Sequence, residues 1–184
     1  MIIYIHGFGS SGFSGKVVQF REYFKEVGED FIAPSLSYIP ELAIQTLEEL
    51  IESYNGNVKL IGSSLGGYYS IYLAQKYNLQ AVLINPSIYP YKTLQRVIGD
   101  APSYYDESSF QWLPLHVEIL KKYETEVKEP SNFMLLTQKG DESLDYNEGV
   151  KKLAGSKMFI EDGGDHGFVG IERHFSNVSD FFML

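Results

Sequence analysis

A serine lies between two glycines in the stretch Gly62-Ser63-Ser64-Leu65-Gly66, which follows an apolar run and precedes a segment with helical spacing. The spacing G-x-S-x-G is typical of a strand-to-helix turn that exposes a nucleophilic hydroxyl. The neighbours two positions away must be small because such a turn is crowded. We therefore predict that Ser64 is a nucleophile. Ser63 is a rival without the flanking glycines, and a plain turn without chemistry is the alternative.

A nucleophilic serine needs a base, and histidine is the usual one. His166 lies in the glycine-rich stretch 163–167, which we place between the last strand and the last helix. We predict His166 as the base. His6 is expected to hold the shape of its own loop by hydrogen bonds, and His116 could at most touch a substrate. His174 falls on the last helix and is expected to be structural or at the surface.

A histidine base needs a carboxylate that fixes its tautomer and stabilises the imidazolium. Asp141 follows the predicted strand 133–138 and is the preferred acid. Asp145 is close enough in sequence to compete, and Glu142 is a weaker third candidate. Asp165 precedes the histidine directly and is expected to be a loop residue, because adjacent side chains rarely face each other.

Two backbone amides could stabilise an oxyanion at this site. The first loop, His6-Gly7-Phe8-Gly9, resembles H-G-x-x loops in which the amide after the glycine points at a substrate carbonyl. The second donor would be the amide of Leu65 at the start of a helix. The side chain of Phe8 could also line the pocket. A glycine-rich turn without chemistry stays open for this loop.

The elements that must position these residues alternate along the chain. Apolar runs predict strands, and 3.6-residue spacing predicts helices. The expected strands are 2–5, 31–33, 58–62, 81–85, 133–138 and 157–160, and the expected helices are 16–27, 41–54, 68–77 and 172–182. This alternation indicates an α/β fold with a mostly parallel sheet covered on both faces by helices.

The chain of 184 residues is interpreted as one domain, 1–184, interrupted by a small, partly helical cap insertion at 87–128. Aromatic residues of this insertion could line an acyl pocket, although packing of the insertion onto the core explains any single one equally well. They are Tyr89, Tyr91, Tyr104, Tyr105, Phe110 and Trp112. Trp112 is taken, with Phe8, as a tentative substrate contact.

Composition excludes several classes of protein. With 44% hydrophobic residues the chain can bury a core, and its net charge of −9 disfavours nucleic acid and anionic membrane surfaces as partners. No cysteine is present, which excludes disulfides, cysteine zinc sites and a cysteine nucleophile. The first apolar run stops at His6, too short for a signal peptide or membrane span, so we expect a cytoplasmic protein. No H-E-x-x-H spacing occurs, and neither a metal nor a cofactor is expected.

Four motifs together resemble one family. The stretches I-Y-I-H-G-F-G-S-S, G-S-S-L-G-G-Y-Y, T-Q-K-G-D-E-S-L-D-Y and G-G-D-H-G-F are similar to those of the YqiA-like esterases, which are compact bacterial α/β-hydrolases. The resemblance implies a reduced fold that starts at the strand before the H-G loop, and hydrolysis of carboxylic esters with short acyl chains. It maps the nucleophile to Ser64, the acid to Asp141, the base to His166 and the oxyanion amides to Phe8 and Leu65.

The resulting hypothesis is a serine esterase that acts on a small-molecule ester through an acyl-enzyme intermediate. A thioesterase or acyltransferase would use the same residues. A non-catalytic ligand-binding or protein-binding module on the same fold is the alternative from another class. The sequence favours no particular oligomeric state and no particular physiological substrate.

Overall fold

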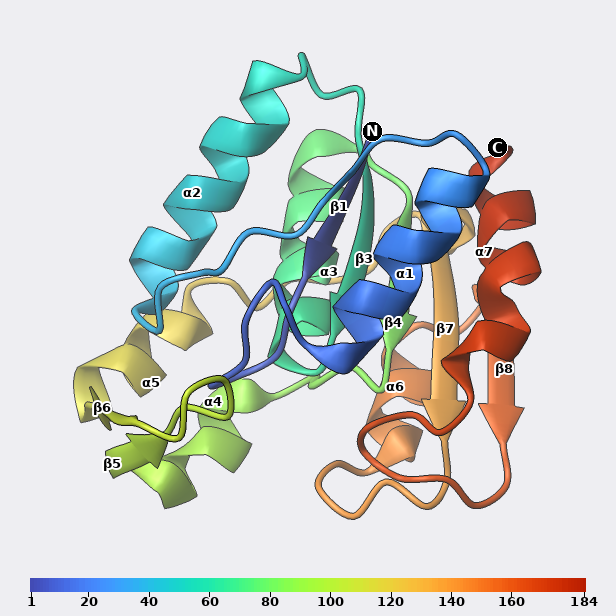
Figure 1. Ribbon diagram of the computed structural model, residues 1–184. Helices are drawn as coiled ribbons and strands as arrows, with labels where there is room; N and C mark the ends of the chain where they lie inside the picture. Colours follow the sequence, from blue (N-terminus) through green and yellow to red (C-terminus); the bar gives the residue numbers. More distant parts are fainter.

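The computed structural model describes residues 1–184 and is built around a six-stranded sheet in the order β2-β1-β3-β4-β7-β8 (Figure 1). All neighbouring strands in it are parallel. The strands are β1 Ile2–Ile5, β2 Phe31–Ile32, β3 Lys59–Ser63, β4 Ala81–Ile84, β7 Phe133–Gln138 and β8 Lys157–Glu161. The predicted parallel sheet is confirmed, and each expected strand agrees with the structure to within one residue at either end.

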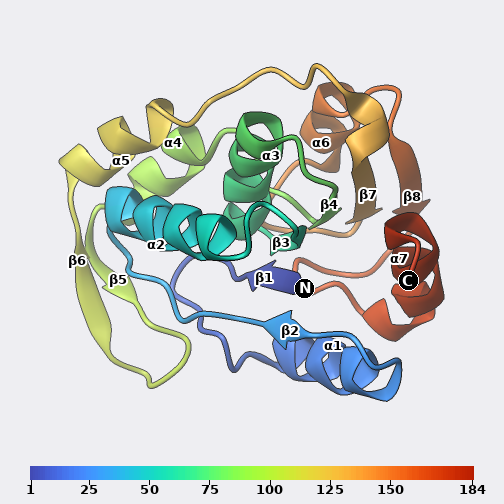
Figure 2. The same cartoon turned by 90° about the horizontal axis from the view of Figure 1, so that it is seen from above.

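Helices cover both faces of this sheet, as predicted. They are α1 Gly15–Glu26, α2 Pro40–Ser53, α3 Leu65–Tyr77, α6 Tyr146–Lys152 and α7 Phe175–Phe182, the last preceded by the 3₁₀ turn η3 Ile171–His174. Figure 2 shows α2, α3 and α6 on one face and α1 and α7 on the other. Helix α3 begins three residues before its predicted start, because tertiary packing overrides the low helix propensity of two glycines in its first turn. The short α6 was not predicted.

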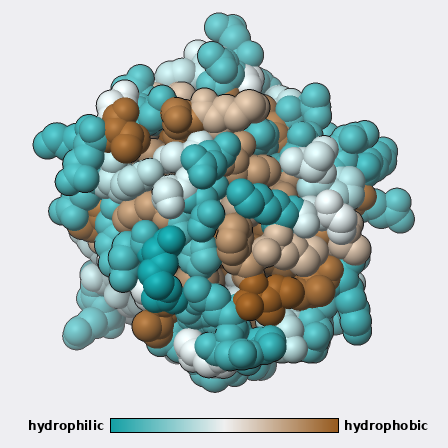
Figure 3. Space-filling view, turned by 90° about the vertical axis from the view of Figure 1, so that its right-hand side faces the viewer, coloured by the Kyte–Doolittle hydropathy of each residue, from teal (hydrophilic) through white to brown (hydrophobic).

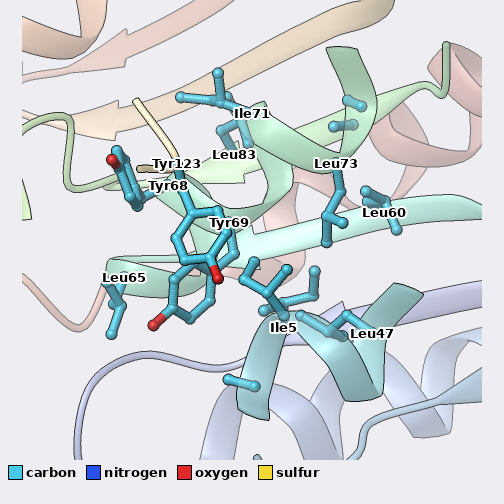
Figure 4. Packing of buried hydrophobic residues seen from close by; sticks show 14 of the residues in the cluster. Ile5, Leu47, Leu60, Leu65, Tyr68, Tyr69, Ile71, Leu73, Leu83 and Tyr123 are labelled. Carbon is cyan, nitrogen blue, oxygen red and sulfur yellow. The ribbon is translucent and has the colours of Figure 1, made fainter. Parts of the chain in front are cut away.

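The buried side chains form two apolar layers, one on each face of the sheet. Strand β1 shows the division: Ile3 and Ile5 belong to the layer under α2 and α3, whereas Ile2 and Tyr4 belong to the layer under α1 and α7. Figure 4 shows part of the first layer, where Ile5 lies among side chains of α2, α3 and β3. Because the central strands are buried on both faces, they have continuous apolar sequences instead of alternating ones.

The segment between β4 and β7 is partly helical, as predicted. It contains α4 Pro90–Thr93, η1 Leu94–Val97, α5 Pro114–Lys121 and η2 Pro130–Asn132. It also contains an antiparallel two-stranded ribbon, β5 Gly99–Pro102 with β6 Ser109–Trp112, which the sequence analysis did not predict. In Figure 1 the ribbon and α4 lie beyond the carboxyl end of β1. The insertion therefore covers the edge of the sheet where loops of an α/β fold carry functional groups.

The side of the molecule that carries α7 and β8 is mostly hydrophilic, with apolar groups interspersed (Figure 3). No helix combines the length and the apolar composition that a membrane crossing requires.

Helix α3 packs so closely on β1 that a side chain at Gly66 has no room. A Cβ atom there would lie 2.0 Å from the carbonyl oxygen of Ile5. At Gly15, the first residue of α1, the same atom would meet nothing within 4 Å. The close approach is therefore particular to the turn after β3.

We expect Gly66→Ala to lower the free energy of unfolding by about 3 kcal/mol, because overpacking must push α3 away from β1. Gly15→Ala is the matched control and should change it by less than about 0.5 kcal/mol. Urea unfolding followed by far-ultraviolet circular dichroism measures both. Equal midpoints for the two variants would contradict the close packing.

Candidate active site

Ser64 occupies an unusual backbone conformation between β3 and α3. Its φ of 55° and ψ of −120° lie in a region that residues other than glycine seldom adopt. The Ser64 N–H donates to the carbonyl of Ile84 at 3.1 Å, and its carbonyl accepts from the N–H groups of Gly67 at 2.9 Å and Ser87 at 3.0 Å. The bonds to Ile84 of β4, to Ser87 after it and to Gly67 of α3 hold the strained turn in place.

The small residues around this turn have the steric role predicted for them. A Cβ atom at Gly62 would lie 2.3 Å from the backbone carbonyl oxygen of Gly66, so position 62 has room only for glycine. Ser63, the rival nucleophile, ends β3 with 5% of its surface exposed and forms no hydrogen bond to a histidine. The turn therefore presents the hydroxyl of Ser64, and not that of Ser63, to an imidazole.

A chain of hydrogen bonds joins Ser64, His166 and Asp141, which come from loops after three different strands. The Oγ of Ser64 lies 3.1 Å from Nε2 of His166, and Nδ1 of His166 lies 2.8 Å from Oδ2 of Asp141. The other carboxylate oxygen of Asp141 accepts from the N–H groups of Ser143 at 2.8 Å and Leu144 at 2.9 Å. The structure thus brings together the three residues that the sequence analysis selected.

The other carboxylates considered from the sequence have different partners. Asp145 caps the N-terminus of α6, where its Oδ1 accepts from the N–H of Asn147 at 2.9 Å. Glu142 accepts from the backbone N–H of His166 at 3.1 Å and does not bond to its ring. Asp165 lies in the loop, with an exposed side chain. Only Asp141 reaches the imidazole.

The carboxylate of Asp141 is held in its ionised form. Burial by itself would raise its pKa, but hydrogen bonds from His166, Leu144 and Ser143 and the attraction of the imidazole together hold the pKa below its ordinary value. An ionised carboxylate accepts the proton on Nδ1 of His166. The unprotonated Nε2 is then the acceptor that faces the hydroxyl of Ser64.

The two amides proposed as oxyanion donors are placed beside Ser64. Leu65 is the first residue of α3, so its N–H has no acceptor within the helix. No backbone or side-chain acceptor bonds to the N–H of Phe8. The loop that carries Phe8 passes close to the serine, since a Cβ at Gly7 would lie 3.1 Å from Cβ of Ser64.

A cavity of about 580 Å³ opens at this point and is lined by Ser64, His166, Phe8 and Leu65. Residues with hydroxyl groups also line it, among them Ser10, Ser14, Thr93, Tyr104 and Ser143. A second cavity of about 140 Å³ is lined by Phe8, Leu65 and Phe110 among others. Phe8 and Leu65 line both spaces and therefore lie between them.

Trp112 lines neither cavity. It is fully buried, its indole N–H donates to the carbonyl of Leu94 at 3.1 Å, and its ring packs edge-on against Phe8 at 4.9 Å between centroids. The structure gives no support to a direct contact between Trp112 and a substrate. Of the other aromatic residues considered for an acyl pocket, Tyr104 lines the larger cavity and Phe110 the smaller one, whereas Tyr89, Tyr91 and Tyr105 line neither.

The remaining histidines have structural hydrogen bonds. Nδ1–H of His6 donates to the carbonyl of the next residue at 2.9 Å, while Nε2 accepts from the N–H of Leu36 at 2.9 Å. His116 accepts from the N–H of Leu113 at the start of α5, and His174 bonds to a glutamate of β8. No three histidine, aspartate and glutamate side chains cluster as metal ligands would.

The sequence analysis missed Asn85, which follows β4 and is 2% exposed. Its Nδ2 donates to the carbonyls of Asp165 at 3.0 Å and His166 at 3.2 Å. Its Oδ1 accepts from the hydroxyl of Thr137 at 3.2 Å and the N–H of Gln138 at 3.0 Å. Asn85 thus ties the loop of His166 to the ends of β4 and β7. A polar amide directly after a buried apolar strand was the signal that could have identified it.

Gln138, the last residue of β7, fastens the same loop. Its Oε1 accepts from the N–H groups of Asp165 at 3.2 Å and Val169 at 2.9 Å, and its Nε2 donates to the carbonyl of Val169 at 2.9 Å. With Asn85, it pairs backbone groups on both sides of His166. The imidazole therefore stands on a loop whose two ends are fixed to the sheet.

Solved structures with the same fold include two proteins whose names state a class of enzyme or domain. One is alpha/beta hydrolase domain-containing protein 10 from mouse, with a TM-score of 0.74, 18% sequence identity, and coverage of 99% of this chain and 89% of its own. The other is the monoacylglycerol lipase of Paleococcus ferrophilus, with a TM-score of 0.72, 18% identity, and coverage of 99% of this chain and 93% of its own. The predicted α/β-hydrolase fold is confirmed.

Among curated proteins, a UPF0227 protein of Citrobacter koseri is 26% identical over 100% of this chain and 99% of its own length. The model of the family described as uncharacterised protein family UPF0227 matches residues 1–183. The similarity in sequence thus extends over the full chain, as the resemblance of the four motifs predicted. The protein belongs to the UPF0227 family and is similar to hydrolases of the α/β fold.

Proposed function

We propose that this protein is a serine hydrolase that cleaves carboxylic esters through an acyl-enzyme intermediate. The observation that carries the proposal is the continuous chain of hydrogen bonds from Ser64 through His166 to Asp141, with spacings of 3.1 and 2.8 Å, at the floor of a cavity. The lipase among the structural neighbours supports ester chemistry on this fold.

In the first half of the reaction, Oγ of Ser64 attacks the ester carbonyl while Nε2 of His166 takes its proton. The imidazolium is stabilised by the carboxylate of Asp141, which stays ionised. Negative charge on the carbonyl oxygen is stabilised by the amides of Phe8 and Leu65, each worth about 3 kcal/mol in the transition state. The imidazolium then protonates the departing alcohol, which leaves an acyl group on Ser64.

In the second half, His166 takes a proton from water as the water oxygen attacks the acyl carbonyl. The same two amides stabilise the second oxyanion. Collapse of this second tetrahedral intermediate transfers the proton from His166 back to Oγ of Ser64 and releases the carboxylic acid. All the proton transfers use one imidazole, so its orientation decides the rate, and neither a metal nor a cofactor has a step in this reaction.

The first prediction concerns the nucleophile. Ser64→Ala should abolish hydrolysis of 4-nitrophenyl acetate, butyrate and octanoate, because no other hydroxyl is hydrogen-bonded to the imidazole. Intact mass after treatment with a fluorophosphonate should show one added group on the unmodified protein and none on the variant. A wild-type protein that neither hydrolyses these esters nor becomes labelled would favour a non-catalytic ligand-binding protein.

A second prediction separates the two aspartates of the loop after β7. Asp141→Asn should lower kcat by about 10³–10⁴-fold, because an amide at this position no longer holds the required tautomer of His166. Asp145→Asn should leave kcat within twofold, since asparagine caps a helix as well as aspartate does. Initial rates with 4-nitrophenyl butyrate test the pair. A reversed order would identify Asp145 as the acid.

A third prediction concerns Asn85, a positioning residue for His166. Asn85→Ala should lower kcat by about 100-fold with KM changed less than threefold, because small displacements of a catalytic group are costly. Thr137→Val is the control, since it removes one bond to Asn85 and leaves the bonds to the loop intact. Fluorophosphonate titration gives the rate per labelled serine. An unchanged rate per labelled serine would show that Asn85 affects only the amount of folded protein.

A further inference from the structure

The wall of the large cavity has a charge pattern opposite to that of the whole chain. The chain holds 24 acidic and 15 basic residues, yet the cavity is lined by Lys16 and Arg96 and by a single carboxylate, Glu142. That carboxylate already accepts from the backbone N–H of His166. The cavity over Ser64 therefore offers an anion two cationic side chains against one lining carboxylate.

Neither of these cations is paired with a carboxylate. No acidic oxygen lies within 4.0 Å of Lys16 or Arg96, whereas the other cations of the chain include several in ion pairs, such as Lys76 with Glu48. Lys16 uses one of its three donors, on the carbonyl of Gly167 at 2.8 Å. The guanidinium of Arg96 donates to no protein group, so its five N–H groups are free.

The two cations approach the cavity from separate parts of the chain. Lys16 lies in the first turn of α1, and Arg96 lies in η1 of the insertion after β4. In Figure 1 the start of α1 lies near the arrowheads of β3 and β4, and the insertion lies beyond the same end of the strands. Burial lowers the pKa of Lys16 to about 8, despite the opposing effect of Asp165 and Asp141, so its ammonium is mostly charged at neutral pH.

We propose that the substrate of this site carries an anionic group, a carboxylate or a phosphate, which Lys16 and Arg96 bind while Ser64 attacks the ester. The inference rests on the proposed function and specifies its substrate class. Arg96 can bind the anion through two parallel N–H groups, and Lys16 supplies a point charge.

Matched pairs of esters test this inference. At the acyl end, 4-nitrophenyl hydrogen adipate and 4-nitrophenyl hexanoate differ by a carboxylate in place of a methyl group. At the alcohol end, 4-acetoxybenzoate and 4-acetoxyphenyl phosphate are compared with neutral 4-acetoxybenzamide. We expect kcat/KM to be at least about tenfold higher for the charged member at one end or the other. The preferred end locates the anion, and the carboxylate and phosphate probes separate the two headgroups.

Variants connect the preference to the two cations. Lys16→Met and Arg96→Gln should each lower the charged-to-neutral ratio of kcat/KM about tenfold, and Arg96→Glu should lower it further through repulsion. Lys92→Met is the control, because Lys92 is an exposed lysine of α4 outside the cavity and should leave the ratio unchanged. Ratios are compared, so a general loss of activity in a variant does not imitate the effect. Because Arg96 is exposed, its variants test the inference even if Lys16→Met fails to fold.

Two results would overturn the inference. If all these esters are hydrolysed and the charged-to-neutral ratios of kcat/KM are near one, the substrate is not anionic, while the proposed serine hydrolase activity stands. A preference for charged esters that survives both Lys16→Met and Arg96→Glu would place the anion elsewhere. Absence of both turnover and fluorophosphonate labelling would instead overturn the proposed function itself, so the two failures are distinguishable.

Discussion

The backbone conformation at Ser64 is the constraint on which the site depends. A residue in this region of φ and ψ costs about 1–3 kcal/mol, and the surrounding structure must hold it there. Here the cost is met by the hydrogen bond to Ile84 of β4, by two amides on the carbonyl of Ser64, and by the tight contact between α3 and β1. Because α3 must start immediately after the strained residue, its first amide faces the space above the hydroxyl. One local strain thus sets the positions of both the proposed nucleophile and one of the proposed oxyanion donors.

The proposed base, His166, is held in place by side-chain hydrogen bonds instead of by backbone strain. His166 stands on a loop without regular structure, so its position depends on side chains that bond to the loop backbone. Asn85 and Gln138 are buried polar residues at the ends of β4 and β7, and leaving them unpaired would cost about 1–3 kcal/mol per group. Their hydrogen bonds to the loop backbone pair these buried polar groups and also fix the position of the imidazole. Since β4 pairs with β3 on one side and with β7 on the other, the two halves of the site are held by the same sheet.

The features of the fold that the sequence predicted correctly are those that depend on local patterns of residues. Buried parallel strands have continuous apolar runs, and the glycines of the turn at Ser64 reflect crowding within five residues. The role of Asn85 was not predicted, because its partners are backbone carbonyls 80 and 81 residues away. Every residue has such a carbonyl, so residue types do not reveal the contact. Asp141 and Asp145 look alike in sequence and separate only because α6 begins at Asp145 and uses it as a cap. The ribbon β5–β6 was missed because each strand has only four residues and β5, Gly99–Pro102, consists mostly of residues that strands disfavour.

The insertion after β4 does more than cover the cavity, because it is attached to the loop that carries Phe8. The N–H of Tyr104, just after β5, donates to the carbonyl of Gly9 at 2.7 Å. On the other side, Trp112 and Phe110 pack edge-on against the ring of Phe8, with centroid separations of 4.9 and 5.3 Å. A displacement of the ribbon would therefore carry the loop with it and shift the amide of Phe8 relative to Ser64. The same segment that supplies Arg96 to the cavity wall thus also fixes one of the two amides proposed to stabilise the oxyanion, which couples the recognition of a substrate to the geometry of its reaction.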